Sequence, residues 1–425
     1  MRIESKFFGV SPKVLPVGRT SVVTFRPLYD HVRFTHGSQH QVAIIPTEGI
    51  AGQTTWGEIP RQAATPVGGA ISVPITPFSE QEYTVLIERI DDRKPKLIAE
   101  FRLCAVDEDL FRCRPWKGDL HVHTHHSDGK ESPAYVAGKY RRAGFDFMAV
   151  TDHRKYAPSL DAIQAYDGVP IDLGIYPGEE VHPPDNPVHI VNFGGRFSIN
   201  ELFDTDEYRS EVGAIEKERG VPYQYASCVW CFDKIREADG LGIFCHPYWI
   251  TQHRYDVPLH LTDMIFARQP YDAFEIIGGF FRGEYESNKL QVARYEEERA
   301  QGKRIPIVGS SDSHGTEQSD LFGWYYTIVF SPTPDLPDII GGIKGLNSVA
   351  VEAITGESPR AFGPFRLVKC VQYLLREVFP IHDELCVEEG RLMLAHAAGD
   401  LDATEMLGRL QGRVRRLYDD IWGVK

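Results

Sequence analysis

The alternation of hydrophobic and polar residues changes its period twice along the chain. Up to about residue 110, short runs rich in β-branched and aromatic residues alternate with proline and glycine turn signals, and no helical period separates them. Strands at this spacing are typical of a small β-sandwich, which we predict as an accessory domain over residues 1–114. The runs lie at residues 21–25, 41–45, 71–75, 83–90 and 97–106.

From about residue 115, strand-like runs alternate with helices or long loops. Ser132 and Pro133 mark the start of one helix, because serine caps a helix and proline fits its first turn, and Gly144 marks its end. Residues 284–301 have the spacing of another helix. This alternation is typical of an α/β barrel, and we predict one of seven strands over residues 115–355. The strand-like runs lie at residues 120–124, 145–151, 173–176, 189–193, 241–245, 273–277 and 305–309.

The last part of the chain, residues 356–425, has the apolar spacing of helices. Val368, Val371 and Leu375 belong to one stripe, and Leu410 and Val414 belong to another. We predict a helical C-terminal segment whose stripes serve either packing against the barrel or subunit contacts in a homo-oligomer.

Composition narrows the classes of function. The chain has 425 residues and a formal net charge of -14, a sign that repels polyphosphate, so nucleic acid is not an expected partner. No apolar run reaches the roughly 18–20 residues that span a bilayer, and the first residues lack the apolar core of a signal peptide. Seven cysteines, an odd number, fit a reducing cytoplasm, with Cys228 and Cys231 as buried thiols on a helix. We therefore predict a cytoplasmic protein that acts on a small molecule.

The informative chemistry lies where the predicted strands end. His121 and His123 are two residues apart, so alternation along a strand points both imidazoles to the same side. The other strands end in further imidazoles and carboxylates, and an α/β barrel has its active site at that face. These ligands suit zinc, manganese or iron, and without a cation the cluster would carry a large desolvation cost. The other members are Asp128, Asp152, His153, Glu179, Glu180, His189, His246, Glu275, Asp312 and His314.

Four segments together resemble the polymerase-and-histidinol-phosphatase (PHP) superfamily. They are residues 118–129 (Gly-Asp-Leu-His-Val-His-Thr-His-His-Ser-Asp-Gly), 149–153 (Ala-Val-Thr-Asp-His), 245–247 (Cys-His-Pro) and 309–314 (Gly-Ser-Ser-Asp-Ser-His). The resemblance covers about residues 115–355 and includes all four motifs of the family in order. It implies a distorted seven-stranded barrel that holds two or three divalent metal ions. The β-domain ahead of it resembles the CehA/McbA-like subgroup, in which hydrolysis of the carbamate ester carbaryl is known.

The resemblance also implies which residues hold the metals. Glu180, rather than Glu179, matches the family pattern of glycine, any residue, then glutamate. His189 opens an apolar run as the family ligand does, whereas His182 lies among prolines and is predicted at the surface. The first ion takes His121, His123, Glu180 and Asp312, the second takes Glu180, His189 and His246, and the third takes Asp128, His153 and His314.

The neighbours of these ligands receive other roles. Asp152 is predicted to orient a metal-bound imidazole, and Glu275 to lie either behind a ligand or at the barrel rim. Side chains just beyond the motifs are predicted to contact substrate, where arginine would suit a phosphate. These are Arg154, Lys155, Tyr248, Trp249, His253 and Arg282.

We predict a metal-dependent phosphoesterase that hydrolyses a small phosphate ester with a hydroxide bridging two of the ions, with Glu180, Asp312 and His314 as the catalytic residues. One alternative is a metal-dependent hydrolase of a carbamate, ester or amide, for which the pocket would be apolar rather than lined by arginine. The other is a non-catalytic metal-binding module. All nine predicted ligand positions hold a residue able to bind a metal, which favours an enzyme.

Overall fold

The structure is a computed structural model that describes residues 5–34, 38–50, 52–55, 57–91, 94–317 and 321–424. The chain divides into two compact units. Unit 1 consists of Met1–Arg114, Gln372–Pro380 and Gly412–Lys425, and unit 2 consists of Pro115–Val371 and Ile381–Gln411. The C-terminal helices are therefore shared between the units. They are α9 (Phe365–Glu377), α10 (Phe379–Ala397), α11 (Asp402–Leu410) and α12 (Arg413–Trp422).

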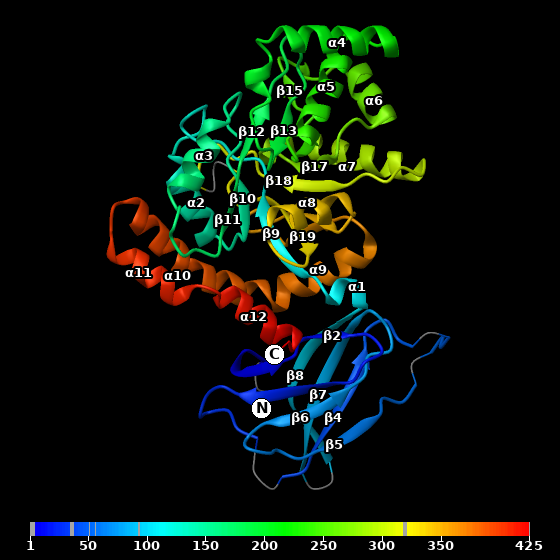
Figure 1. The fold of residues 1–425 in the computed structure, drawn as a ribbon. Helices are drawn as coiled ribbons and strands as arrows, with labels where there is room; N and C mark the ends of the chain where they lie inside the picture. The colour runs from blue at the N-terminus through cyan, green and yellow to red at the C-terminus, as the bar shows by residue number, and fades with distance from the viewer. Residues whose placement is uncertain are drawn as a thin grey trace. The chain divides into compact units, whose positions relative to one another are not determined.

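Unit 1 contains two β-sheets that share one hydrophobic core (Figure 1). The pattern of β6 shows why: Ile71, Val73 and Ile75 are buried and the residues between them are exposed, so alternate side chains face the core. All five predicted runs lie in these strands. One sheet has the order β1 (Phe8–Ser11), β3 (Ser21–Pro27), β6 (Ile71–Ile75), and the other has the order β2 (Val14–Pro16), β8 (Lys94–Val106), β7 (Glu82–Asp91), β4 (His40–Pro46), β5 (Arg61–Ala64).

Unit 2 has the mixed α/β architecture that the sequence predicts. Most of its strands form two larger sheets, and β13 pairs antiparallel with both β12 and β14. A separate two-stranded sheet consists of β15 (Ile250–Thr251) and β16 (Arg254–Tyr255). Strand β12 was not among the predicted runs. The first sheet has the order β11 (Gly174–Tyr176), β10 (Phe147–Ala149), β9 (Arg114–Asp119), β19 (Tyr325–Ser331), β20 (Ser348–Glu352), β21 (Arg360–Phe362). The second has the order β12 (Gly178–Val181), β13 (Ile190–Phe193), β14 (Leu241–Phe244), β17 (Ala273–Gly278), β18 (Ile307–Ser310).

Helix α2 (Pro133–Arg142) begins and ends at the residues that the sequence predicts. The Ser132 side chain accepts a hydrogen bond from the Tyr135 N–H at 3.4 Å, and Gly144 follows the helix with a φ of 85°. No helix in the described ranges is long and apolar enough to cross a membrane. The α-helices of unit 2 ahead of α9 are α2 (Pro133–Arg142), α3 (Ala157–Gln164), α4 (Asp206–Arg219), α5 (Tyr223–Glu237), α6 (Leu259–Arg268), α7 (Tyr285–Ala300) and α8 (Leu336–Lys344).

The first barrel strand lies earlier than predicted. We expected it at residues 120–124, but β9 ends at Asp119 and the two histidines follow it. The reason is the Asp119 carboxylate, which accepts hydrogen bonds from the backbone N–H groups of His121 (3.3 Å) and Ser311 (3.0 Å). The carboxylate thus adds to the backbone hydrogen bonds between the two ligand-bearing segments, in which the His123 N–H donates to the Ser313 carbonyl and the Asp312 N–H donates to the His121 carbonyl, both at 2.9 Å.

A buried ionic network joins α10 to the sheet within unit 2. The Asp146 carboxylate accepts hydrogen bonds from His382 Nε2 (2.9 Å), an Arg141 guanidinium nitrogen (3.2 Å) and the Lys117 backbone N–H (3.0 Å). Arg141 also pairs with Glu389 at 2.7 Å. Burial alone would raise the pKa of Asp146, but His382 and Arg141 lower it below its usual range. Burial alone would lower the pKa of His382, but Asp146 raises it well above 6.5.

Replacement of Asp146 by asparagine is expected to lower the free energy of unfolding of unit 2 by about 3–5 kcal/mol, because it leaves buried cations without their anion. Urea unfolding near pH 5.5 measures the loss. Glu405→Gln, which removes one partner of an exposed pair with Arg409 on α11, is the control and should cost less than about 1 kcal/mol. An equal cost for the two variants would contradict the prediction.

The same network predicts a pH dependence. The contribution of Asp146 is present above its ordinary pKa of 3.8 and is lost as the pH falls through its lowered pKa. The contribution of His382 is complete below its ordinary pKa of 6.5 and is lost as the pH rises through its raised pKa. The difference in stability between wild type and Asp146→Asn should therefore be largest between these two values.

Candidate metal centre

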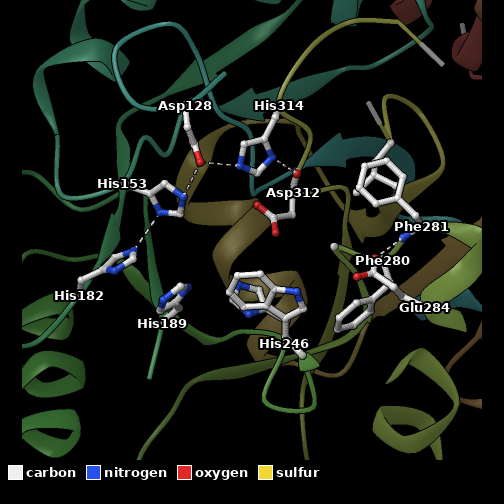
Figure 2. A pocket seen from close by; sticks show the side chains of 13 residues that line it. Asp128, His153, His182, His189, His246, Phe280, Phe281, Glu284, Asp312 and His314 are labelled. Carbon is white, nitrogen blue, oxygen red and sulfur yellow. Dashed lines mark hydrogen bonds and ion pairs between the residues drawn. The ribbon is translucent and has the colours of Figure 1, made fainter. Parts of the chain in front are cut away.

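The structure brings the nine predicted ligands together around one cavity of 370 Å³ in unit 2. The ligands come from segments that follow β9, β10, β14 and β18, from β12 itself, and from the residue before β13. Figure 2 shows Asp128, His153 and His314 on one side of the cavity, His189 and His246 below them, and Asp312 near its centre. His121, His123 and Glu180 are buried.

The Glu180 carboxylate is the centre of the cluster. Its Oε1 lies 2.8 Å from His189 Nδ1, 3.4 Å from His246 Nε2 and 3.6 Å from His121 Nε2. Its Oε2 lies 3.6 Å from His123 Nε2 and in close contact with His153 Nδ1. Despite this proximity, both carboxylate oxygens, His121 Nε2 and His189 Nδ1 lack a hydrogen-bond partner within the described part of the chain. Buried polar atoms left unpaired are costly, and bound cations would satisfy all of them, so these residues fit a metal centre.

The ligand atoms gather in three overlapping groups. His123 Nε2 and His121 Nε2 lie 2.8 Å and 3.3 Å from Asp312 Oδ1. Asp128 Oδ2 lies 3.2 Å from His314 Nε2 and 3.4 Å from His153 Nε2. In each group the candidate atoms lie within 4.8 Å of one another. The groups are His121, His123 and Asp312; His121, Glu180 and His246; and His123, Asp128, His153 and His314.

The charges of the cluster keep the Glu180 and Asp312 carboxyl groups ionised at neutral pH, which is the form that binds a metal ion. Burial raises the pKa of a carboxyl, yet His189 and His121 hold the pKa of Glu180 well below its usual range. Asp312 is likewise kept ionised: His121 and His123 outweigh its burial and lower its pKa. Burial would lower the pKa of His153, but its contact with Glu180 raises that pKa to about 9. The imidazoles thus neutralise the carboxylates as bound cations would.

His182 corrects the sequence analysis, which placed it at the surface. Its Nε2 lies 2.9 Å from His153 Nδ1 and 3.4 Å from Glu180 Oε2, and its ring centroid is 4.0 Å from that of His189. The antiparallel register pairs Val181 with Ile190, and its continuation by one residue sets His182 opposite His189. The sequence analysis predicted a single strand at residues 189–193. A prediction of an antiparallel hairpin over residues 178–193 would have placed His182 beside His189.

Three carboxylates beside the cluster, Glu179, Asp152 and Glu275, have different hydrogen-bond partners. Glu179 points away from the cluster and accepts hydrogen bonds from Ser198 (2.8 Å) and Asn200 (2.8 Å). Asp152 corrects a prediction: it holds no imidazole but accepts from the Thr124 hydroxyl at 2.6 Å and from Ser127, and so fixes the loop after His123. Glu275 accepts from His121 Nδ1 at 3.1 Å and from the Ser310 hydroxyl at 2.7 Å. Since a carboxylate only accepts, His121 carries its proton on Nδ1 and presents Nε2 to the cluster.

Replacement of Glu275 by glutamine is expected to weaken metal binding about 10–100-fold, because the His121 imidazole loses the charge that raises its basicity. Competition with a chromophoric chelator measures the affinity. Glu298→Gln is the matched control, because Glu298 is also buried but pairs with Arg294 (2.9 Å) and Lys303 instead of an imidazole. Equal affinities of the two variants would contradict this role of Glu275.

The predicted substrate contacts differ from the observed lining of the cavity. Trp249 lines it, as predicted, but the other five do not, namely Arg154, Lys155, Tyr248, His253 and Arg282. Arg154 is exposed, Tyr248 is buried, and Arg282 donates a hydrogen bond to the Thr355 carbonyl at 2.6 Å. The lining is completed by His182 and by residues that the sequence analysis did not single out, namely Phe280, Phe281, Glu284 and Leu321, together with Gly279.

Comparisons with known proteins give structural neighbours only. No protein-family model matches the chain, and no curated protein matches it. A two-domain protein from Bacteroides vulgatus, described as containing a predicted PHP-like metal-dependent phosphoesterase, is similar at 17% identity and a TM-score of 0.41. The match covers 56% of this chain and 65% of that one, which is less than two thirds of its length.

Two further neighbours match over most of their own length. A proposed metal-dependent phosphoesterase from Bifidobacterium adolescentis is 18% identical, with a TM-score of 0.34, over 49% of this chain and 92% of that one. An amidohydrolase from Chromobacterium violaceum, with bound sulfate and no metal, is 16% identical, with a TM-score of 0.30, over 47% and 87%. The description of the Bacteroides vulgatus neighbour contains the PHP name, and none of these descriptions refers to the CehA/McbA-like subgroup. We argue the function from the side chains of the site.

Proposed function

We propose that this protein is a metal-dependent hydrolase whose histidine–carboxylate cluster holds two or three divalent ions, with zinc, manganese and iron as the candidates. The observation that carries the proposal is Glu180: a fully buried carboxylate with two unpaired oxygens among imidazoles from four other segments. When bound, such ions activate water as a nucleophile and neutralise charge on the reacting group. The proposed ligands are His121, His123, Asp128, His153, Glu180, His189, His246, Asp312 and His314.

The chain itself orients these ligands. His314 Nδ1 donates a hydrogen bond to the Asp312 backbone carbonyl at 2.8 Å, so its Nε2 is left as the ligand atom that faces Asp128. Asp119 and Tyr140 connect the ligand-bearing segment after β9 to the one after β18. The Tyr140 hydroxyl lies 2.9 Å from the Asp119 carboxylate and 2.8 Å from the Ser313 hydroxyl. These bonds hold Asp312 and His314 in position at the cavity. We place the reaction there, with Glu180, Asp312 and His314 as the catalytic residues.

We also propose that the two larger sheets of unit 2 together form the predicted seven-stranded barrel. Two isolated parallel bridges support this: Val122 pairs with Ser313, and His153 pairs with Glu180. The first bridge joins the segments that follow β9 and β18, and the second joins the segment after β10 to β12. Strands β12 and β18 are the two edges of the second sheet. The bridges would close a ring of β9, β10, β12, β13, β14, β17 and β18, with the candidate ligands at one rim.

A phosphate ester is the first substrate class, because cations at this cluster would supply the positive charge that phosphoryl transfer needs. One observation favours a second class, the carbamates, esters and amides. The described residues that line the cavity include no lysine or arginine, whereas Trp249, Phe280, Phe281 and Leu321 make part of it apolar. The same ligands would serve attack at a carbonyl carbon.

A two-panel assay tests the proposal. Protein reconstituted with manganese or zinc is given phosphomonoesters and phosphodiesters, and then carbamates, aryl esters and amides. Turnover that is lost in His121→Ala and kept in His125→Ala, an exposed imidazole outside the cluster, would support the proposal. Silence of both panels, from protein shown to contain its metals, would refute it.

A further inference from the structure

One wall of the cavity has a chemistry that the metal centre does not use. We call it the distal wall and define it as Trp249, Phe280, Phe281, Glu284 and Leu321. Figure 2 shows Phe280, Phe281 and Glu284 grouped across the cavity from Asp128, His153 and His182. Trp249 is 36% exposed and Phe281 is 47% exposed, so both rings offer surface to a bound molecule.

Glu284 is the only charged side chain of the distal wall. It accepts a hydrogen bond from the Phe281 backbone N–H at 3.1 Å through Oε2, and it forms no ion pair with any described residue. The nearest arginine in sequence, Arg282, turns to the Thr355 carbonyl and lies over the Trp324 ring at 5.7 Å. The wall therefore presents a carboxylate and aromatic faces, with no cation of the chain placed to neutralise them among the described lining residues.

Aromatic faces beside one carboxylate are the surroundings that recognise an organic cation. The π-faces attract the cation electrostatically, and the carboxylate adds a direct charge interaction. A neutral apolar group would leave the charge of Glu284 without an opposite charge in a partly enclosed site, and an anionic group would be repelled by it. The net charge of -14 also favours the approach of a cation.

The distal wall is close enough to the metal centre for one small molecule to contact both. The Trp249 ring centroid lies 6.2 Å from that of His246 and 6.5 Å from that of His189. We infer that the substrate carries an ammonium group held by Trp249, Phe281 and Glu284, a short chain away from the ester bond that is hydrolysed. This inference rests on the proposed function and names its substrate class: an ester of a small amino alcohol.

The test compares choline esters with neohexyl esters, in which carbon replaces the quaternary nitrogen and the shape is kept. Acetate and phosphate esters of both alcohols are assayed with the manganese-loaded protein, so that the two reaction classes are distinguished. We expect kcat/KM to favour the choline ester about tenfold or more, equal to about 1.4 kcal/mol. Glu284→Gln, which keeps an oxygen to accept from Phe281, and Trp249→Leu should each reduce this ratio. Glu286→Gln, which changes an exposed carboxylate in the first turn of α7 outside the lining, should leave it unchanged.

Calorimetric titration of choline and of neohexanol gives a readout that does not depend on turnover. Choline binding that weakens about tenfold in Glu284→Gln, with no binding of neohexanol, would support the inference. Choline binding without turnover of any ester would uphold the distal wall as a cation site and refute the proposed hydrolysis instead. Equal kcat/KM values for the paired esters, or choline binding unaffected by Glu284→Gln, would overturn the inference.

Discussion

Replacement of Glu180 by glutamine is expected to reduce kcat/KM of the metal-loaded protein by at least about 10³-fold. The substitution keeps the size of the side chain and removes a fully buried charge that faces imidazoles from several segments, including His121, His189 and His246. Charge stabilisation by metal ions is worth several kcal/mol at the transition state, and each 1.36 kcal/mol corresponds to about tenfold in rate. Loss of the shared ligand should also lower the number of ions bound per chain, which elemental analysis measures.

Glu179→Gln is the matched control for this prediction. Glu179 is the adjacent carboxylate on the same strand and is also fully buried, but its oxygens accept hydrogen bonds from Ser198, Ile199 and Asn200. We expect this variant to lose stability and to keep its metals. A Glu180→Gln protein that retained wild-type metal content and turnover, or a Glu179→Gln protein that lost its metals while folded, would refute the assignment of Glu180.

Removal of the metals is expected to lower the unfolding temperature of unit 2 by about 10 °C or more and to abolish turnover reversibly. A ligand present at 100 times its Kd stabilises the native state by about 2.7 kcal/mol, and two or three ions add their contributions. For a unit of this size, each kcal/mol shifts the unfolding temperature by about 2–4 °C. Scanning calorimetry with and without a chelator measures the shift, and added manganese or zinc should restore it.

The Glu180→Gln protein shows whether this stabilisation arises at the cluster. In that variant the chelator should change the unfolding temperature far less than in wild type, since the shared ligand is gone. A chelator effect of equal size in both proteins would place the stabilising ions elsewhere, and no effect in wild type would contradict the metal centre itself.

Local sequence determined much of this protein. The caps at Ser132 and Gly144, the strand patterns of unit 1 and the identities of the candidate ligands were all predicted from residues close in the chain. These features depend on short-range physics: alternation along a strand, hydrogen bonds within one helical turn, and the donor atoms of the side chains themselves. The division of the candidate ligands among three ions comes from the family resemblance and stays a prediction.

The tertiary structure alone decided the features that depend on pairing between distant segments. His182 joins the cluster because β12 and β13 are antiparallel, and the register of two strands is not encoded in either strand by itself. Glu275 reaches His121 across 154 positions of sequence, and Phe281 and Glu284 enter the cavity from a segment that carries no metal-binding motif. A side chain's chemistry is read from its type, but its partners are set by the packing of the whole unit. The ligands could therefore be named from the sequence, whereas the wall that faces the substrate could not.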